Sequence, residues 1–245
     1  MRQKVTTLSD FYASPLGQAA ARIMSDKVAR LWPSAQGLSV LGYGYATPLL
    51  EGRCGGAQRA IAAMPGAQGS VWWGPTGRGA SVGLTEEHHL PFSDGMFDRV
   101  VVLHGLEEAP NPLAMLRELW RVMAPEGRIV VVAANRGGLW SRATSTPFGH
   151  GRPWTRRQLS SLLADTLFQT SAWTHALHVP PVSARMVAAT SDIWERAGER
   201  IVKGLGGVVM VEAVKRLYIE PKGTAAAPAL GVQKVRPLTS EQRKG

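Results

Sequence analysis

The sequence contains one cysteine, no long apolar run and no internal repeat. Cys54, the single cysteine among 245 residues, cannot form an internal disulfide, so a reducing, cytoplasmic setting is expected. No apolar run reaches the roughly 18 residues needed to cross a bilayer, so no membrane segment is predicted. Residues 1–10 lack the apolar core of a signal peptide, and secretion is not expected. These absences leave a globular chain of ordinary composition, with 44% hydrophobic and 19% charged residues.

The net charge of +10 is unevenly distributed along the chain. Residues 215–245 carry seven basic residues against two acidic ones, which makes +5, half of the total. Beyond Glu220 the sequence lacks hydrophobic periodicity, and residues 221–245 are predicted to form a disordered tail. A basic protein can bind nucleic acid. No RNA-binding motif or aromatic stacking platform supports that function here.

Strands without polar alternation occupy the middle of the sequence. Residues 100–103 and 128–134 are apolar runs separated by a helix that begins at Asn111-Pro112. Such strands are buried on both faces, and their strand–helix–strand order predicts parallel pairing. The fold class is therefore α/β, a doubly wound, mostly parallel, Rossmann-like seven-stranded sheet with helices on both faces. Further strands are predicted at 38–41, 59–64, 81–84, 168–178 and 208–214, and helices at 14–31, 47–58, 158–167 and 185–202.

A glycine-rich turn follows the first predicted strand. It reads Gly42-Tyr43-Gly44-Tyr45-Ala46 and precedes the helix expected from Thr47 or Pro48. Glycine has no Cβ, so the backbone of such a turn can approach a ligand closely, and the helix N-terminus adds unpaired N–H donors. Many strand–helix turns carry two glycines for packing alone, so a packing role stays open.

Three later segments follow this turn in a recognisable order. They are Glu86–Phe92, Phe97–His104 and Leu116–Arg128. With the turn, they resemble the class I S-adenosylmethionine-dependent methyltransferases, especially the small-molecule type 11 group, from about residue 38 to 134. The resemblance implies S-adenosylmethionine as cofactor and methyl transfer to a small-molecule acceptor. The expected organisation is an N-terminal helical extension (1–37), a methyltransferase-like domain (38–220) and the tail (221–245).

The resemblance implies a cofactor site at the carboxyl edge of the sheet. Glu86 matches an acid that lies near the adenine amino group in the family, where a carboxylate accepts from the exocyclic amine. His88 is either near the adenine edge or solvated. His104 would face the transferred methyl, act as a base, or only form a hydrogen bond. The full set of expected cofactor contacts is Gly42, Tyr43, Gly44, Ala46, Glu86, Glu87, His88 and Leu103.

Residues 135–157 are predicted to form a loop on the substrate side of the sheet. Arg142 and Arg152 are candidates to pair with a carboxylate or phosphate of the acceptor, and His150 is a candidate proton acceptor. Trp154 and the earlier Tyr12 are grouped with them, Tyr12 as a cover over the cofactor. The alternative is a loop pinned by aromatic packing with surface arginines. No metal site is predicted.

Two positions depart from the family pattern. Val40 stands where the first-strand motif usually has an acid, and residues 62–64 (Ala-Ala-Met) stand where a carboxylate would bind the ribose hydroxyls. That contact is charge-assisted, so its absence suggests weak cofactor binding, compensation by a group such as Glu51, or loss of catalysis. A catalytically inactive binding or regulatory partner is therefore an alternative, with Trp72-Trp73 as a surface for a protein partner. A nucleic-acid methyltransferase is a further alternative.

Overall fold

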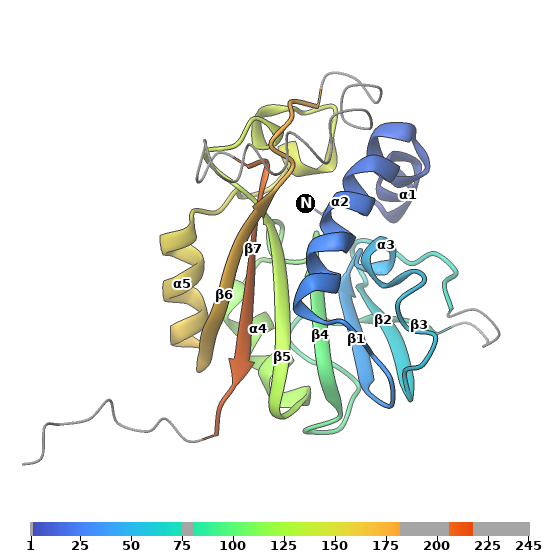
Figure 1. Cartoon of the computed structure of the whole chain (residues 1–245), viewed down its shortest axis with the longest axis vertical. Helices are drawn as coiled ribbons and strands as arrows, with labels where there is room; N and C mark the ends of the chain where they lie inside the picture. The colour runs from blue at the N-terminus through green and yellow to red at the C-terminus, as the bar shows by residue number, and fades with distance from the viewer. Residues whose placement is uncertain (1, 75–80, 182–205, 218–245) are drawn as a thin grey trace, which may run out of the picture.

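The computed structural model describes residues 2–74, 81–181 and 206–217, which form one seven-stranded sheet between two layers of helices (Figure 1). The strand order is β3-β2-β1-β4-β5-β7-β6. β7 is antiparallel to both β5 and β6, and the other neighbours are parallel. The predicted fold class is therefore confirmed. The strands are β1 (Ser39–Gly44), β2 (Arg59–Pro65), β3 (Val82–Thr85), β4 (Phe97–Leu103), β5 (Met123–Ala134), β6 (Phe168–Ala176) and β7 (Val208–Lys215).

Side chains of the central strands alternate between two apolar cores. Val101 and Leu103 of β4 lie in the core under α1, α2 and α3, whereas Val100 and Val102 lie in the core under α4 and α5. Both faces of the sheet are covered, which explains why the strands show no polar alternation. The helices are α1 (Val5–Ala13), α2 (Pro15–Leu31), α3 (Thr47–Leu50), α4 (Pro112–Val122) and α5 (Arg156–Asp165).

The long helices begin at side chains that satisfy their first N–H groups. Ser14 accepts a hydrogen bond from the Gly17 amide at the start of α2, as the Ser-Pro pair predicts, and Asn111 does the same at α4. Thr155 and Gln158 form a capping box at α5. These local signals explain why the predicted starts of α2 and α4 agree with the structure.

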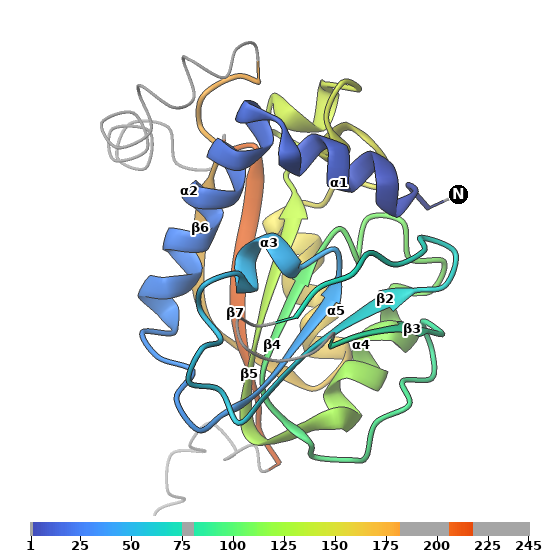
Figure 2. The same ribbon diagram turned by 90° about the vertical axis from the view of Figure 1, so that its right-hand side faces the viewer.

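Two expectations about local structure change. The helix predicted over 47–58 ends after Leu50, because three glycines follow and Gly52 has a φ of +70°. Helix α1 was not expected, since Lys4 before it offers no side-chain cap. It lies across the carboxyl ends of the strands (Figure 2). The helix predicted at 185–202 and the tail at 221–245 lie outside the described residues.

No helix among the described residues is long and apolar enough to cross a membrane. The 135–157 segment lies over the carboxyl edge and contains two short 3-10 turns, Trp140–Arg142 and Pro147–Gly149.

Candidate functional site

The glycine turn is packed tightly against its own protein. Gly44 has a φ of +80°, and a Cβ there would lie 2.3 Å from the Leu103 carbonyl oxygen. The Tyr45 amide donates to that same oxygen at 2.7 Å. A Cβ on Gly42 would lie 2.7 Å from Leu50 Cδ1. Contacts within the chain therefore account for both glycines.

An amino-terminal arm, residues 2–4, crosses the carboxyl edge of the sheet. Arg2 is buried there and donates hydrogen bonds to the carbonyl oxygens of His104 (3.3 Å) and Gly105 (2.9 Å). Its guanidinium also forms an ion pair with Glu87. Just after the arm, the Val5 amide donates to the Gln68 carbonyl oxygen beyond β2. The arm thus spans the edge from the loop after β2 to the end of β4.

His104 is buried beneath α1 and held by aromatic neighbours. Its Nε2 lies 2.8 Å from the Tyr12 hydroxyl, and its ring centroid lies 4.8 Å from that of Phe148. Burial lowers the pKa of His104 to about 3, so the imidazole is neutral near pH 7. Tyr12 also stacks on Tyr45 of the glycine turn. His104 is therefore a hydrogen-bonding group in this arrangement.

Glu107 is a buried carboxyl group three residues after His104. One of its oxygens accepts from the Ala134 amide at 2.8 Å, and the other has no hydrogen-bond partner. Burial raises the pKa of Glu107 to about 7. A carboxyl group that titrates near neutral pH in such a position is a candidate functional group.

Unpaired polar groups are concentrated along this edge. Among the described residues, nine buried side-chain nitrogen or oxygen atoms lack a hydrogen-bond partner, and each such atom costs about 1–3 kcal/mol. Six of the nine lie in the arm or at the carboxyl ends of β1 to β4. They are Gln3 Oε1, Tyr43 OH, Gln68 Nε2, Thr85 Oγ1, Glu87 Oε2 and Glu107 Oε2.

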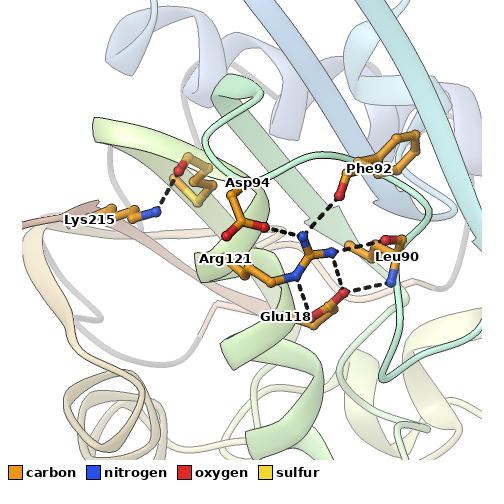
Figure 3. Close-up of polar contacts among 7 residues, drawn as sticks. Leu90, Phe92, Asp94, Glu118, Arg121 and Lys215 are labelled. Carbon is orange, nitrogen blue, oxygen red and sulfur yellow. Dashed lines mark hydrogen bonds and ion pairs between the residues drawn. The ribbon is translucent and has the colours of Figure 1, made fainter.

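The loop after β3 is fixed to helix α4 by Arg121. Its guanidinium donates to the carbonyl oxygens of Leu90 (3.0 Å) and Phe92 (2.9 Å) and pairs with Asp94 and Glu118 (Figure 3). Glu118 in turn accepts from the Leu90 amide at 2.8 Å. This network was not expected from the sequence. It holds the loop that carries Glu87 into the site.

Neighbouring residues of the same loop point in different directions. Glu86 and His88 are exposed, with 3.6 Å between a Glu86 oxygen and His88 Nε2, whereas Glu87 points inward to Arg2. Tyr43 is also buried near Arg2 and Glu87, and burial is the main cause that raises its pKa. The structure therefore brings together Tyr43, Glu87 and His104 from the predicted site and leaves Glu86 and His88 at the surface.

Three of the predicted substrate-side residues lie at the surface. Arg142, His150 and Arg152 are exposed. His150 Nε2 lies 2.9 Å from the Thr144 carbonyl oxygen, and Arg152 lies over the Trp154 ring at 4.6 Å. Trp154 itself is buried in the core under α4 and α5. The residue of this segment that contacts His104 is Phe148, which was not predicted.

The ribose position is apolar in the structure. Residues 62–64 are fully buried in β2, and Val40 is buried in β1. Glu51, the suggested substitute, is exposed after α3 and lines a cavity with Trp72 and Trp73. None of the residues that line that cavity belongs to β2.

Arg2, Gln3, Glu107 and Phe148 were missed as site residues. Glu107 lies three residues after Phe97–His104, a segment that resembles the family, so its place near the site could have been predicted from the sequence. Arg2 and Gln3 carried no such signal, because nothing local indicates that the arm returns to the sheet.

Comparisons with known proteins agree with the fold. Residues 74–131 match the family model of a methyltransferase domain. The fold matches a possible histamine N-methyltransferase from Thermotoga maritima with a TM-score of 0.59, at 15% identity, over 86% of this chain and 96% of that one. The chain thus has the fold of S-adenosylmethionine-dependent methyltransferases, and its residues 74–131 are similar to a methyltransferase domain. The match in fold extends well beyond the segment that the family model covers.

Curated relatives match part of the chain. An uncharacterized protein of Mycobacterium tuberculosis is 32% identical over 152 residues, which is 59% of this chain and 50% of that protein. A demethylmenaquinone methyltransferase of the same species is 28% identical over 127 residues, 52% of this chain and 43% of that enzyme. The chain thus spans about half the length, or less, of the curated relatives it matches.

The groups around Arg2 fit one end of the methyltransferase cofactor. S-adenosylmethionine carries an ammonium and a sulfonium, and the carbonyl oxygens of His104 and Gly105 with the Glu87 carboxylate form a set of acceptors suited to a cation. Residues 62–64, expected at the ribose from the resemblance, offer no carboxylate. The ammonium of the cofactor therefore fits the acceptors of this edge, which Arg2 occupies in this structure.

Proposed function

We propose that this chain binds S-adenosylmethionine at the carboxyl edge of the sheet and transfers its methyl group to a small-molecule acceptor. The observation that carries the proposal is the row of buried, unpaired polar atoms beneath the arm. Native proteins pair almost all such groups, and a polar ligand at this edge would pair them. Two relatives in family or fold are named for small-molecule methylation, which supports this class of acceptor.

The chain's own residues would bind and orient the two reactants. Glu87 and the carbonyl oxygens of His104 and Gly105 would accept from the cationic end of the cofactor. The bound sulfonium supplies an electrophilic methyl group, so catalysis needs mainly alignment and exclusion of water. Tyr12 and Phe148 form an aromatic wall over His104 that excludes water. His104, with a pKa of about 3, is too weak a base at pH 7 and instead positions the Tyr12 hydroxyl.

The arm opposes cofactor binding in this proposal. Arg2 already donates to the acceptors that the cofactor would use, so the two compete. When the competent state is only a fraction of the population, the apparent affinity falls by that fraction. If the arm is open about a tenth of the time, the affinity for S-adenosylmethionine is about tenfold weaker than without Arg2.

Titration calorimetry with S-adenosylmethionine tests both points. Arg2→Ala is expected to bind about tenfold more tightly than wild type, and Lys4→Ala, which removes an exposed charge from the same arm, is expected to bind like wild type. Absence of binding up to millimolar concentration in all three proteins would overturn the proposal. If Arg2→Ala and Lys4→Ala raise the affinity for S-adenosylmethionine by the same factor, the gain comes from the lost positive charge in general. That result would contradict specific competition by Arg2.

A second candidate is a non-catalytic relative that acts as a binding or regulatory partner. The apolar ribose position and the self-packed glycine turn favour it. This candidate predicts that neither wild type nor Arg2→Ala binds the cofactor. Methylation of any small acceptor by the isolated chain would exclude it.

A further inference from the structure

A cavity that includes four aromatic residues among its twelve described lining residues lies beside the glycine turn and α1. It has a volume of about 480 Å³ and is lined by residues of α1 and α2, of the glycine turn and α3, and by residues 71–73 of the loop after β2. Four aromatic rings line it, from Tyr12, Tyr45, Trp72 and Trp73. Cavities of this size hold small organic molecules.

Two of the four rings are fixed by contacts within the chain. Tyr12 and Tyr45 stack with their centroids 5.6 Å apart and 19° between their planes. The Tyr12 hydroxyl is engaged by His104. Trp73 is held through its carbonyl oxygen, which accepts from the Ser81 amide at 2.8 Å. Trp72, by contrast, is 75% exposed and is available to a ligand in the cavity.

The charge of the cavity is opposite to that of the protein. Glu51 is the one charged residue among the described residues that line it, and no lysine or arginine is among them. The whole chain carries a net charge of +10. Among the described lining residues an anion would therefore meet only a carboxylate, whereas a cation would meet that carboxylate and aromatic rings.

We propose that this cavity binds a small organic cation, a protonated or quaternary amine. Aromatic faces attract such cations through the ring quadrupole, and groups of rings are the usual means of recognising alkylated ammonium. Glu51 adds charge attraction at the cavity surface. The proposal that the cavity binds a cation rests on the residues that line it and does not depend on the proposed function. The cation's role as the amine methyl acceptor rests on the proposed function, and Tyr12 connects the cavity to His104 at the end of β4.

The test compares choline with 3,3-dimethyl-1-butanol, which has the same shape without the charge. Binding is followed by calorimetry and by tryptophan fluorescence of the full chain. Choline is expected to bind at least tenfold more tightly than the neutral analogue. Trp72→Ala is expected to weaken choline binding about tenfold, and Glu51→Gln about fivefold. Asp165→Asn removes an exposed carboxylate on α5 and serves as the matched control, with no change expected.

The outcomes separate this proposal from the proposed function. Equal binding of the two probes, no binding of choline, or no effect of Trp72→Ala would overturn the cation site, whatever S-adenosylmethionine does. Both variants lie at exposed positions, so thermal unfolding is measured to confirm that they fold. Discrimination between the two probes without any binding of S-adenosylmethionine would uphold the cation site and overturn the proposed function.

Discussion

Two arginines hold the same loop after β3 in different ways. Arg121 binds the carbonyl oxygens of Leu90 and Phe92 from the α4 side, and its other partners, Asp94 and Glu118, are carboxylates. Arg2 binds Glu87 from the carboxyl edge together with two carbonyl oxygens of the loop after β4. One arginine belongs to a helix of the domain, the other to an arm that precedes the first helix.

The two arginines differ mainly in whether the polar groups around them all have hydrogen-bond partners. The groups around Arg121 pair with one another, and Glu118 uses both oxygens. Around Arg2, one oxygen of Glu87 and one of Glu107 remain unpaired, as does the Tyr43 hydroxyl. A network with every group paired stabilises a fixed structure, whereas a partly paired one is costly. Arg121 is thus a fixed part of the fold, whereas Arg2 lies where the proposed function places the cationic end of the cofactor.

The largest expected contrast is in the pH dependence of stability. The pKa of Glu107 is raised to about 7, so the folded state binds more protons than the unfolded state between about pH 4.5 and 7. Its contribution to stability is present below that window and is lost as pH rises through 7, by about 3 kcal/mol at most. Relative to wild type, Glu107→Gln should therefore gain stability across this window in urea unfolding.

Glu118 should show the opposite sign. Its hydrogen bond to Arg121 lowers the pKa of the carboxyl group, so its contribution is present above about pH 4.5 and is lost as pH falls. The quantity to compare is the free energy of unfolding of wild type minus that of the variant at each pH. The subtraction is needed because His104 also titrates, and its contribution to stability is lost below its unfolded pKa. Equal pH trends for Glu107→Gln and Glu118→Gln would contradict the contrast between the two regions.

The next effect is the loss of the Arg121 network. Arg121→Ala removes five hydrogen bonds to the loop and helix and leaves Glu118 without its cation. We expect the free energy of unfolding to fall by about 2 kcal/mol. Arg117→Ala, an exposed arginine on the same helix, should change it by less than about 0.5 kcal/mol. Similar losses in both variants would show that the network adds little.

The smallest effect concerns local opening of the arm. The Gln3 amide donates to Glu108 at 2.7 Å and the Val5 amide to Gln68 at 2.8 Å, while the Leu90 amide donates to Glu118 at 2.8 Å. Despite similar distances, hydrogen exchange at Gln3 and Val5 should be faster than at Leu90, because the arm opens without the core. Equal protection at the three amides would place the arm in the cooperative fold.

The core of the fold was predictable from the sequence because its signals are local. The unalternating runs in β4 and β5 and the Ser14 and Asn111 caps each act within a few residues. The end of α3 after Leu50 was missed, because a glycine-interrupted stretch was taken as a helix. Helix α1 was missed because it forms by packing against the sheet without a cap.

The site was predictable only where it coincides with the family motifs. Those motifs located the carboxyl edge, Tyr43, Glu87 and His104. The contacts of Arg2 span 85 to 103 residues of sequence, and no periodicity or spacing reports such a return. At the glycine turn the sequence indicates more than the structure shows. Its glycines are typical of a ligand-binding turn, but the space beside them is occupied by Leu50 and by the end of β4.

The most direct measurement is hydrogen exchange at Gln3 and Val5 with and without saturating S-adenosylmethionine. If cofactor and arm share the carboxyl edge, exchange at these two amides should rise with the fraction of cofactor bound, while Leu90 keeps its protection. Cofactor that binds while Gln3 and Val5 keep their protection would contradict the shared site.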